Sequence, residues 1–167
     1  MLNIGLARGA QCVLLFSSLV GATACGPTVD LATGLEIDEI STGWLNAGVV
    51  DGKNKVVPAV TFKLKNVSDQ KLSTLQVNAL FRQVDSTEEW GSGFLTVAGS
   101  SGLAPGAETP PLMIKSPLGY TGSDQSRLEM LQNSHFKDAK VELFAKYGSV
   151  QWVRLGTYPI TRQLLTK

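Results

Sequence analysis

Apolar and polar side chains alternate along two neighbouring segments of the chain, residues 60–65 and residues 74–82. The apolar positions are Val60, Phe62 and Leu64 in the first segment and Leu75, Val77, Ala79 and Phe81 in the second. Successive side chains of an extended strand point to opposite faces, so a two-residue period collects the apolar ones on one face. The alternation therefore predicts half-buried β-strands over both segments.

Turn residues separate these strands from their neighbours. Asp51-Gly52 predicts a tight hairpin, because both residues tolerate the positive φ that such turns require. Pro58 is expected at the start of a strand, because proline cannot donate a hydrogen bond to a sheet. Gly91 and Gly93 interrupt a further strand over residues 90–97, where they predict a β-bulge.

One short helix is predicted near residue 126. Ser126 has the side chain of an N-cap, and Glu129 follows at the spacing of a capping box. Leu128, Met130 and Leu131 are expected to face inward from this helix. The remaining pattern consists of short strands at regular spacing, separated by clusters of Gly, Pro, Asn and Asp, which is typical of a sandwich. The predicted fold of residues 35–167 is an all-β, antiparallel, immunoglobulin-like β-sandwich with one short helix.

Residues 1–24 have the composition of a cleaved signal helix. They contain one charge, Arg8, followed by an apolar run and the small residues Ala22-Thr23-Ala24. A basic start, a short apolar stretch and an A-x-A ending are the three parts of a secretory signal peptide, cleaved here after Ala24. The apolar run is shorter than the roughly 20 residues that span a bilayer core. Export from the cytoplasm is therefore predicted.

Cleavage after Ala24 leaves one cysteine, Cys25, at the new N-terminus. A lone thiol is unusual in an oxidising compartment and requires an explanation. The segment Ala22-Thr23-Ala24-Cys25 resembles a bacterial lipoprotein precursor, in which signal peptidase II cuts before a cysteine that becomes lipidated. The resemblance implies a lipid such as palmitate on Cys25, with residues 25–34 as a tether. In enterobacterial lipoproteins, a residue other than Asp after the cysteine favours the outer membrane, so the resemblance with Gly26 at this position implies an outer-membrane protein that faces the periplasm. Ala22-Thr23-Ala24 also fits signal peptidase I, which would cleave without lipidation.

Charge gives no indication of a polyanionic partner. The chain contains 15 Lys and Arg against 14 Asp and Glu, and loss of Arg8 with the signal peptide leaves 14 of each. A nucleic-acid-binding protein needs a basic excess to neutralise phosphates, so nucleic acid is not an expected partner. The expected partners are the membrane, through the lipid on Cys25, and a protein of the cell envelope.

A second resemblance concerns the predicted sandwich. Residues 60–81 resemble the central hairpin of FxLYD-type immunoglobulin-like modules, with Lys65-Asn66 ending the first strand and Phe81 ending the second. Residues 103–108 resemble the later Pro-Gly turn of the same family. Asn78 and Arg82 stand where the naming motif has Phe and Asp. The resemblance implies an immunoglobulin-like architecture and brings no catalytic residues.

Few residues are candidates for catalysis or metal binding. His135 is the single histidine and lies outside any nucleophile motif, and Glu88-Glu89 is the one acidic pair considered for glycosidic chemistry. The chain lacks the Cys and His spacings of zinc sites and the acidic spacing of an EF-hand, so no metal or cofactor is predicted. An envelope hydrolase that uses His135 or the Glu88-Glu89 region is the least favoured of three functional hypotheses.

The aromatic residues suggest a binding function. Trp44, Trp90 and Tyr120 are candidate contacts for a partner protein or for a glycan, if they form a surface platform together with Trp152. The alternative is that the tryptophans complete the core, where Trp is highly buried on average. The favoured function is a non-catalytic, lipid-anchored scaffold or accessory interaction module of an envelope assembly. A glycan-binding lipoprotein that uses the same aromatic residues is the second hypothesis.

Overall fold

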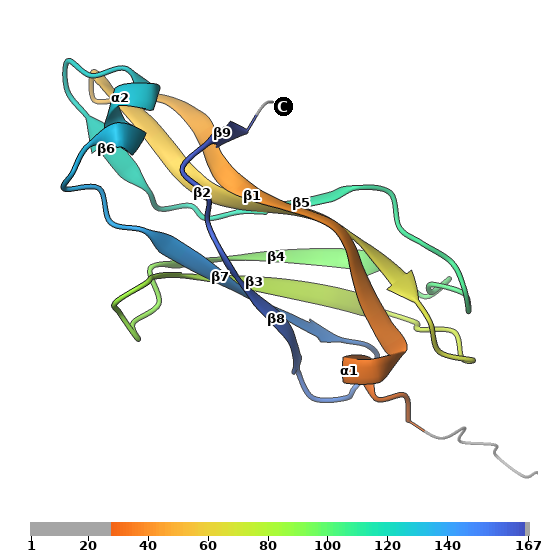
Figure 1. Cartoon of the computed structure of the whole chain (residues 1–167). Coiled ribbons are helices and arrows are strands. Elements are labelled where there is room, and N and C mark those ends of the chain that lie inside the picture. The colour runs from red at the N-terminus through yellow and green to blue at the C-terminus, as the bar shows by residue number, and fades with distance from the viewer. Residues whose placement is uncertain (1–27, 166–167) are drawn as a thin grey trace, which may run out of the picture.

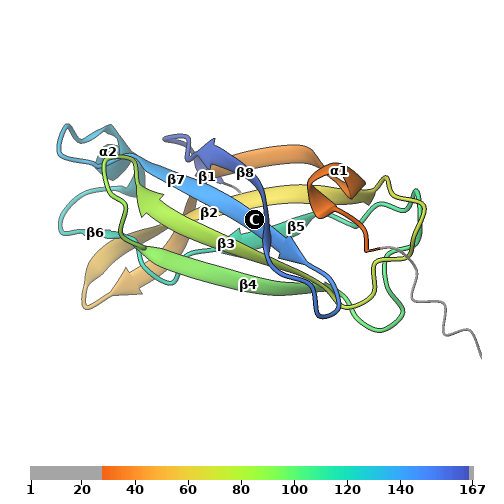
Figure 2. The same cartoon turned by 90° about the horizontal axis from the view of Figure 1, so that it is seen from below.

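Two β-sheets pack face to face in the computed structural model, which describes residues 28–165 (Figures 1 and 2). The first sheet contains β1 (Leu35–Val50), β2 (Lys53–Asn66), β5 (Leu112–Lys115), β6 (Tyr120–Gly122) and β9 (Leu164–Leu165). The second contains β3 (Leu75–Gln83), β4 (Gly91–Ala98), β7 (Ala139–Lys146) and β8 (Val153–Pro159). Two short helices, α1 (Leu31–Gly34) and α2 (Arg127–Gln132), accompany the sheets.

The strand order confirms the predicted immunoglobulin-like sandwich. The first sheet runs β5-β2-β1-β9, with β6 also paired to β2, and the second runs β4-β3-β7-β8. In immunoglobulin lettering, β1, β2 and β5 occupy positions A, B and E, whereas β3, β4, β7 and β8 occupy C, C′, F and G. All strand pairs are antiparallel except β1 with β9, which is parallel over two residues.

The core lies between the two sheets and is built from the predicted alternation. Buried and partly exposed residues alternate along β3 and β7, so each strand contributes one face to the core. The paired residues Val77 and Ala145, and likewise Ala79 and Leu143, are fully buried. Burying a side chain of this kind stabilises the fold by roughly 1.5–3 kcal/mol for the larger ones. The sheets are therefore held together mainly by apolar contact.

The Asp51-Gly52 hairpin is confirmed. Val50 pairs with Lys53, and the two residues between them have φ of 50° and 72°. Positive φ at both central positions is the requirement of a type I′ turn, whose twist matches that of the strands it joins. The turn starts the long β1–β2 pair, whose register shifts twice further along. Pro58 pairs with Trp44 inside β2, so its predicted place at the start of a strand is wrong.

The bulge predicted at Gly91 and Gly93 is wrong. The register of the β3–β4 pair shifts at the opposite end of β4, where Leu75 pairs with Ala98 and Gln76 pairs with Thr96. A Cβ atom on Gly93 would overlap the side chain of Ile114, and one on Gly91 would overlap Ser116. The two glycines are therefore needed because β4 approaches β5 of the opposite sheet closely.

Helix α2 confirms the predicted capping box and corrects one of its faces. Ser126 Oγ accepts a hydrogen bond from the Glu129 amide, and Glu129 Oε2 accepts one from the Ser126 amide at 2.6 Å. Met130 and Leu131 are buried as predicted, whereas Leu128 is 53% exposed. The buried direction lies between residues 130 and 131, and at 100° per residue Leu128 is about 110° away from it.

The sandwich begins earlier than residue 35. Leu31 of α1 is fully buried in the core, and Asp30 caps this helix by accepting a hydrogen bond from the Ala32 amide at 2.9 Å. The amide of Val29 donates to the hydroxyl of Tyr147 at 2.5 Å. Part of the predicted 25–34 tether is thus fixed to the domain. The predicted signal peptide, its cleavage at Ala24 and the lipid site Cys25 lie outside the described residues.

Candidate functional site

Three of the four aromatic residues predicted as a surface platform come together, whereas Trp152 lies against Phe94. Trp44 from β1, Trp90 from the loop before β4 and Tyr120 from β6 lie with ring centroids 5.0–6.0 Å apart. Phe136 joins them, 4.7 Å from Trp44 and 4.5 Å from Tyr120. These four residues, the Trp44 cluster, lie at the end of the sandwich that carries α2 and β6 (Figure 1).

The Trp44 cluster is part of the core, which confirms the alternative that Trp44 completes the core and contradicts a surface platform at this residue. This side chain has no exposed surface, because Tyr120 and Phe136 cover it. Its indole Nε1 has no acceptor among the described residues. Trp90 and Tyr120 are half-buried and pack on the same core. The cluster therefore closes one end of the sandwich.

Tyr120 is the first residue of β6. Its hydroxyl donates to the Lys137 carbonyl and accepts from the Gln83 side chain, each at 3.4 Å. Burial raises the pKa of this phenol. The ring is held by strand pairing, by packing and by both hydrogen bonds.

Arg162 fixes the segment that carries Phe136. Its guanidinium lies 5.3 Å from the Phe136 ring centroid and donates to the carbonyls of Leu131 and Phe136, at 3.3 and 2.9 Å. Its Nε donates to Asp138 Oδ1 at 2.6 Å. One cation thus joins the end of α2 to the start of β7.

The Asp138–Arg162 pair gives a testable pH dependence. The hydrogen bond from Arg162 lowers the pKa of the Asp138 carboxyl. Such a carboxyl stabilises the fold above its unfolded-state pKa, and that contribution is lost as pH falls through the folded pKa. We expect an NMR titration to place the Asp138 midpoint below that of an unfolded-chain aspartate, and Arg162→Met to raise it. Arg154→Met is the matched control, and a midpoint insensitive to Arg162→Met would contradict the pairing.

The predicted catalytic candidates are exposed on the surface. His135 is exposed, and its Nδ1 lies 3.4 Å from the hydroxyl of its chain neighbour Ser134. It lines a hollow of about 210 Å³ together with Tyr120, Thr121, Gln125, Met130, Asn133 and Phe136. Glu88 and Glu89 are exposed in the β3–β4 loop. Within residues 28–165, no group of three His, Cys, Asp or Glu side chains could hold a metal ion.

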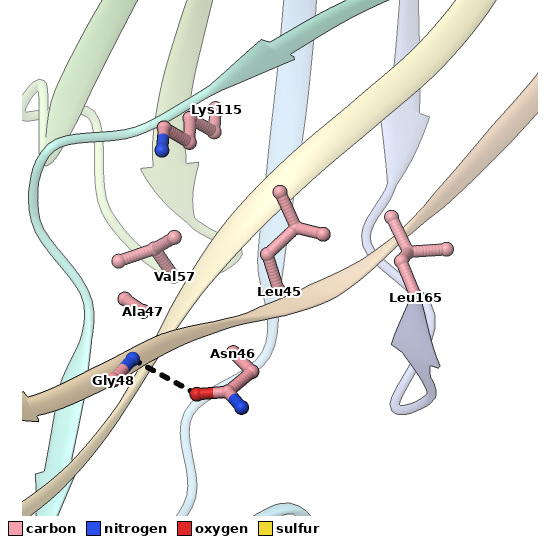
Figure 3. A pocket seen from close by; sticks show the side chains of 7 residues that line it. All are labelled: Leu45, Asn46, Ala47, Gly48, Val57, Lys115 and Leu165. Atoms are coloured by element: carbon pink, nitrogen blue, oxygen red, sulfur yellow. Dashed lines mark hydrogen bonds between the residues drawn. The ribbon is translucent and has the colours of Figure 1, made fainter. Parts of the chain in front are cut away.

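A larger hollow, of about 610 Å³, lies on the outer face of the first sheet (Figure 3). Its apolar wall is formed by Leu45, Val57 and Leu165, which form a small hydrophobic cluster with Ala59. Lys115 borders it, and the side chain of Asn46 is turned to the Gly48 amide at 2.8 Å. The sequence did not predict this hollow, because it depends on the two-residue strand β9 returning to pair with β1.

Two aromatic side chains are exposed on the outer face of the second sheet. Phe94 of β4 is 58% exposed and Trp152, just before β8, is 39% exposed. Their rings meet edge to face with centroids 6.3 Å apart, and Lys146 Nζ lies 5.0 Å from the Trp152 centroid. We call these three residues the Phe94–Trp152 patch. The sequence carried a signal for Phe94, which shares its side of the strand with Ser92 and Thr96.

The outer face of the second sheet also carries an excess of basic residues. Lys146 belongs to the patch, whereas Arg82 and Lys140 pair with each other six residues along the strands from it. The outer face of β3, β7 and β8 carries four basic side chains and one acidic one, namely Arg82, Lys140, Lys146, Arg154 and Glu142. Glu142 binds both Arg82, at 3.3 Å, and Arg154, at 3.7 Å. This face is therefore locally positive, although the chain as a whole is nearly balanced.

No family model matches the chain, and no curated protein matches it. Solved structures are similar to the chain at low sequence identity, and two of them are described. One is the X-ray structure of the Northeast Structural Genomics Consortium target SoR45, with 12% identity, a TM-score of 0.43, and coverage of 78% of this chain and 89% of that one. The other is the ligand binding region of serine-glutamate repeat protein A (SgrA) of Enterococcus faecium, with 15% identity, a TM-score of 0.28, and coverage of 68% and 87%.

Proposed function

We propose that this chain is a lipid-anchored protein of the bacterial cell envelope and that its sandwich serves as a non-catalytic accessory interaction module. The supporting observation is how soon the fold begins after Cys25. Three residues separate Cys25 from Val29, whose amide donates a hydrogen bond to the hydroxyl of Tyr147. A lipid on Cys25 would therefore hold a folded domain directly at the membrane surface.

The opposite end of the sandwich offers a surface for a partner. Apolar residues are exposed there at the tip of the β1–β2 hairpin, in α2 and in the loop before β6. They are Val49 (63%), Val50 (41%), Leu128 (53%) and Leu118 (52%). Arg127 joins α2 to the hairpin by donating to the Gly48 carbonyl at 3.0 Å. A fixed apolar tip remote from the anchor suits a protein contact.

Within residues 28–165, no helix is long and apolar enough to cross a membrane.

Cys25→Ser tests the anchor. We expect the wild-type protein to fractionate with membranes and to incorporate labelled palmitate, and the variant to lose the label and become soluble after cell disruption. Cys12→Ser is the matched control, because residue 12 belongs to the predicted signal peptide, and it should change neither result. Membrane fractionation unchanged by Cys25→Ser would contradict the proposal and favour cleavage without lipidation.

Photo-cross-linking in intact cells tests the partner. A photoreactive amino acid at Val50 should yield a reproducible cross-linked protein. The same probe at Met113 of β5, which has a matched exposure of 42% against 41%, should not. Equal cross-linking from both positions would contradict a contact at the hairpin tip.

A further inference from the structure

We propose that the Phe94–Trp152 patch contacts the lipid headgroups of the membrane, so that the outer face of the second sheet faces the bilayer. This inference rests on the proposed lipid anchor at Cys25. It adds an orientation, because an anchor alone leaves the domain free to turn about its tether.

The length of the tether places the patch near the anchor. Val29 is bound to the hydroxyl of Tyr147, and Lys146 of the patch is the residue before Tyr147. Four residues span at most about 14 Å, so Cys25 lies within that distance of Val29 whatever path the chain takes. Helix α1 and the β7–β8 turn, which leads to Trp152, lie at the same end of the sandwich (Figure 1).

The side chains of the patch suit the interface between lipid and water. Tryptophan is enriched at headgroup level, because its ring is apolar and its N–H is polar. Phe94 adds an apolar ring that contacts Trp152, and both are exposed in the sandwich. Exposed aromatic rings of this kind are stabilised when they leave water.

The charge of the surrounding face favours an anionic surface. Lys146 stacks on Trp152, and the side chain of Arg154 is 61% exposed. Basic residues close to a membrane that contains anionic lipid are attracted to its surface. The single acidic residue of this face, Glu142, is held by Arg82 and Arg154. A membrane that contains anionic lipid is therefore the occupant that the patch fits best.

Tryptophan fluorescence of the full-length lipidated protein in vesicles tests the proposal. The vesicles contain phosphatidylethanolamine and phosphatidylglycerol, with a fraction of lipid spin-labelled at the headgroup as a short-range quencher. The chain has three tryptophans. Because Trp44 and Trp90 belong to the Trp44 cluster at the far end, the difference between wild type and Trp152→Phe isolates Trp152. We expect a quenched, blue-shifted Trp152 component, lost in Trp152→Phe and weakened by Lys146→Glu.

A tryptophan on the opposite face is the matched control. Met113→Trp in the Trp152→Phe background places an indole on the outer face of the first sheet, where Met113 is 42% exposed. This indole should remain unquenched. Equal quenching at positions 113 and 152, or no Trp152 component in protein that floats with the vesicles, would overturn the orientation alone. Cross-linking of the patch to an acidic protein without lipid quenching would also overturn it. Failure of the purified protein to float would overturn the anchor itself.

Discussion

Replacing Trp44 by alanine should lower the free energy of unfolding by about 3–5 kcal/mol, the range seen when a fully buried tryptophan is truncated. Trp44 has no exposed surface and contacts the rings of Trp90, Tyr120 and Phe136. Alanine would leave a cavity, and these rings are held by strand pairing and by Arg162, so they cannot collapse into it freely. Urea denaturation at an unchanged slope measures the loss.

Two further variants separate burial from chemistry at this position. Trp44→Phe keeps much of the volume and removes an indole N–H that finds no acceptor among the described residues, so it should cost less than Trp44→Ala. Trp152→Ala is the exposed control and should change stability by less than about 1 kcal/mol. If Trp44→Ala were as mild as Trp152→Ala, the placement of Trp44 in the core would be wrong.

The average burial of tryptophan favours a core position for Trp44, but the alternation that identifies most of the strands does not show it. Alternation identifies β3 because one face of that strand meets the core and the other meets solvent. In β1 the rule fails, because the four residues from Thr42 to Leu45 are all buried. Tyr120 and Phe136 cover the inner side of Trp44, and β9 pairs along the edge of the strand at the same place. A strand that is covered on both faces shows no alternation of apolar and polar residues.

The sequence also could not reveal contacts between distant segments. The sequence shows that Phe94 lies on the same side of its strand as polar residues. Its contact with Trp152 depends on how the β7–β8 turn folds over the sheet. Helix α1 was missed because four residues have no helical period to detect, and its position depends on burial of Leu31. The capping box of α2 was legible, because Ser126 and Glu129 satisfy each other within four residues. Local hydrogen bonding can be predicted from sequence, whereas long-range packing needs the structure.

Asn66→Ala should lower the free energy of unfolding by about 3 kcal/mol, since it removes four hydrogen bonds worth roughly 0.5–1.5 kcal/mol each. The fully buried Asn66 amide donates to the carbonyls of Gln70 and Leu103, at 2.8 and 2.9 Å. Its Oδ1 accepts from the amide and hydroxyl of Ser68, at 3.0 and 2.6 Å. One side chain thus joins the end of β2 to two loops. Asn54→Ala, which removes one hydrogen bond to Gln125, is the matched control and should cost about 1 kcal/mol.

Asn66→Asp identifies which half of this network matters, because it keeps the shape and the acceptors but replaces the donor. Near neutral pH the new carboxylate would face the Gln70 and Leu103 carbonyl oxygens without a proton to share, in a buried site, so the variant should be at least as unstable as Asn66→Ala. Burial and the facing carbonyls favour the protonated acid, which raises its folded-state pKa above the unfolded value. Its stability relative to wild type should therefore be greatest below the unfolded pKa and fall as pH rises through the folded pKa. Urea denaturation of both proteins between about pH 4 and 8 measures this difference in the free energy of unfolding. Subtracting the wild-type value at each pH removes the contribution of all other titrating groups. A difference that stays constant with pH would show that the donated hydrogen bonds to Gln70 and Leu103 contribute little, and that Asn66 acts through its contact with Ser68.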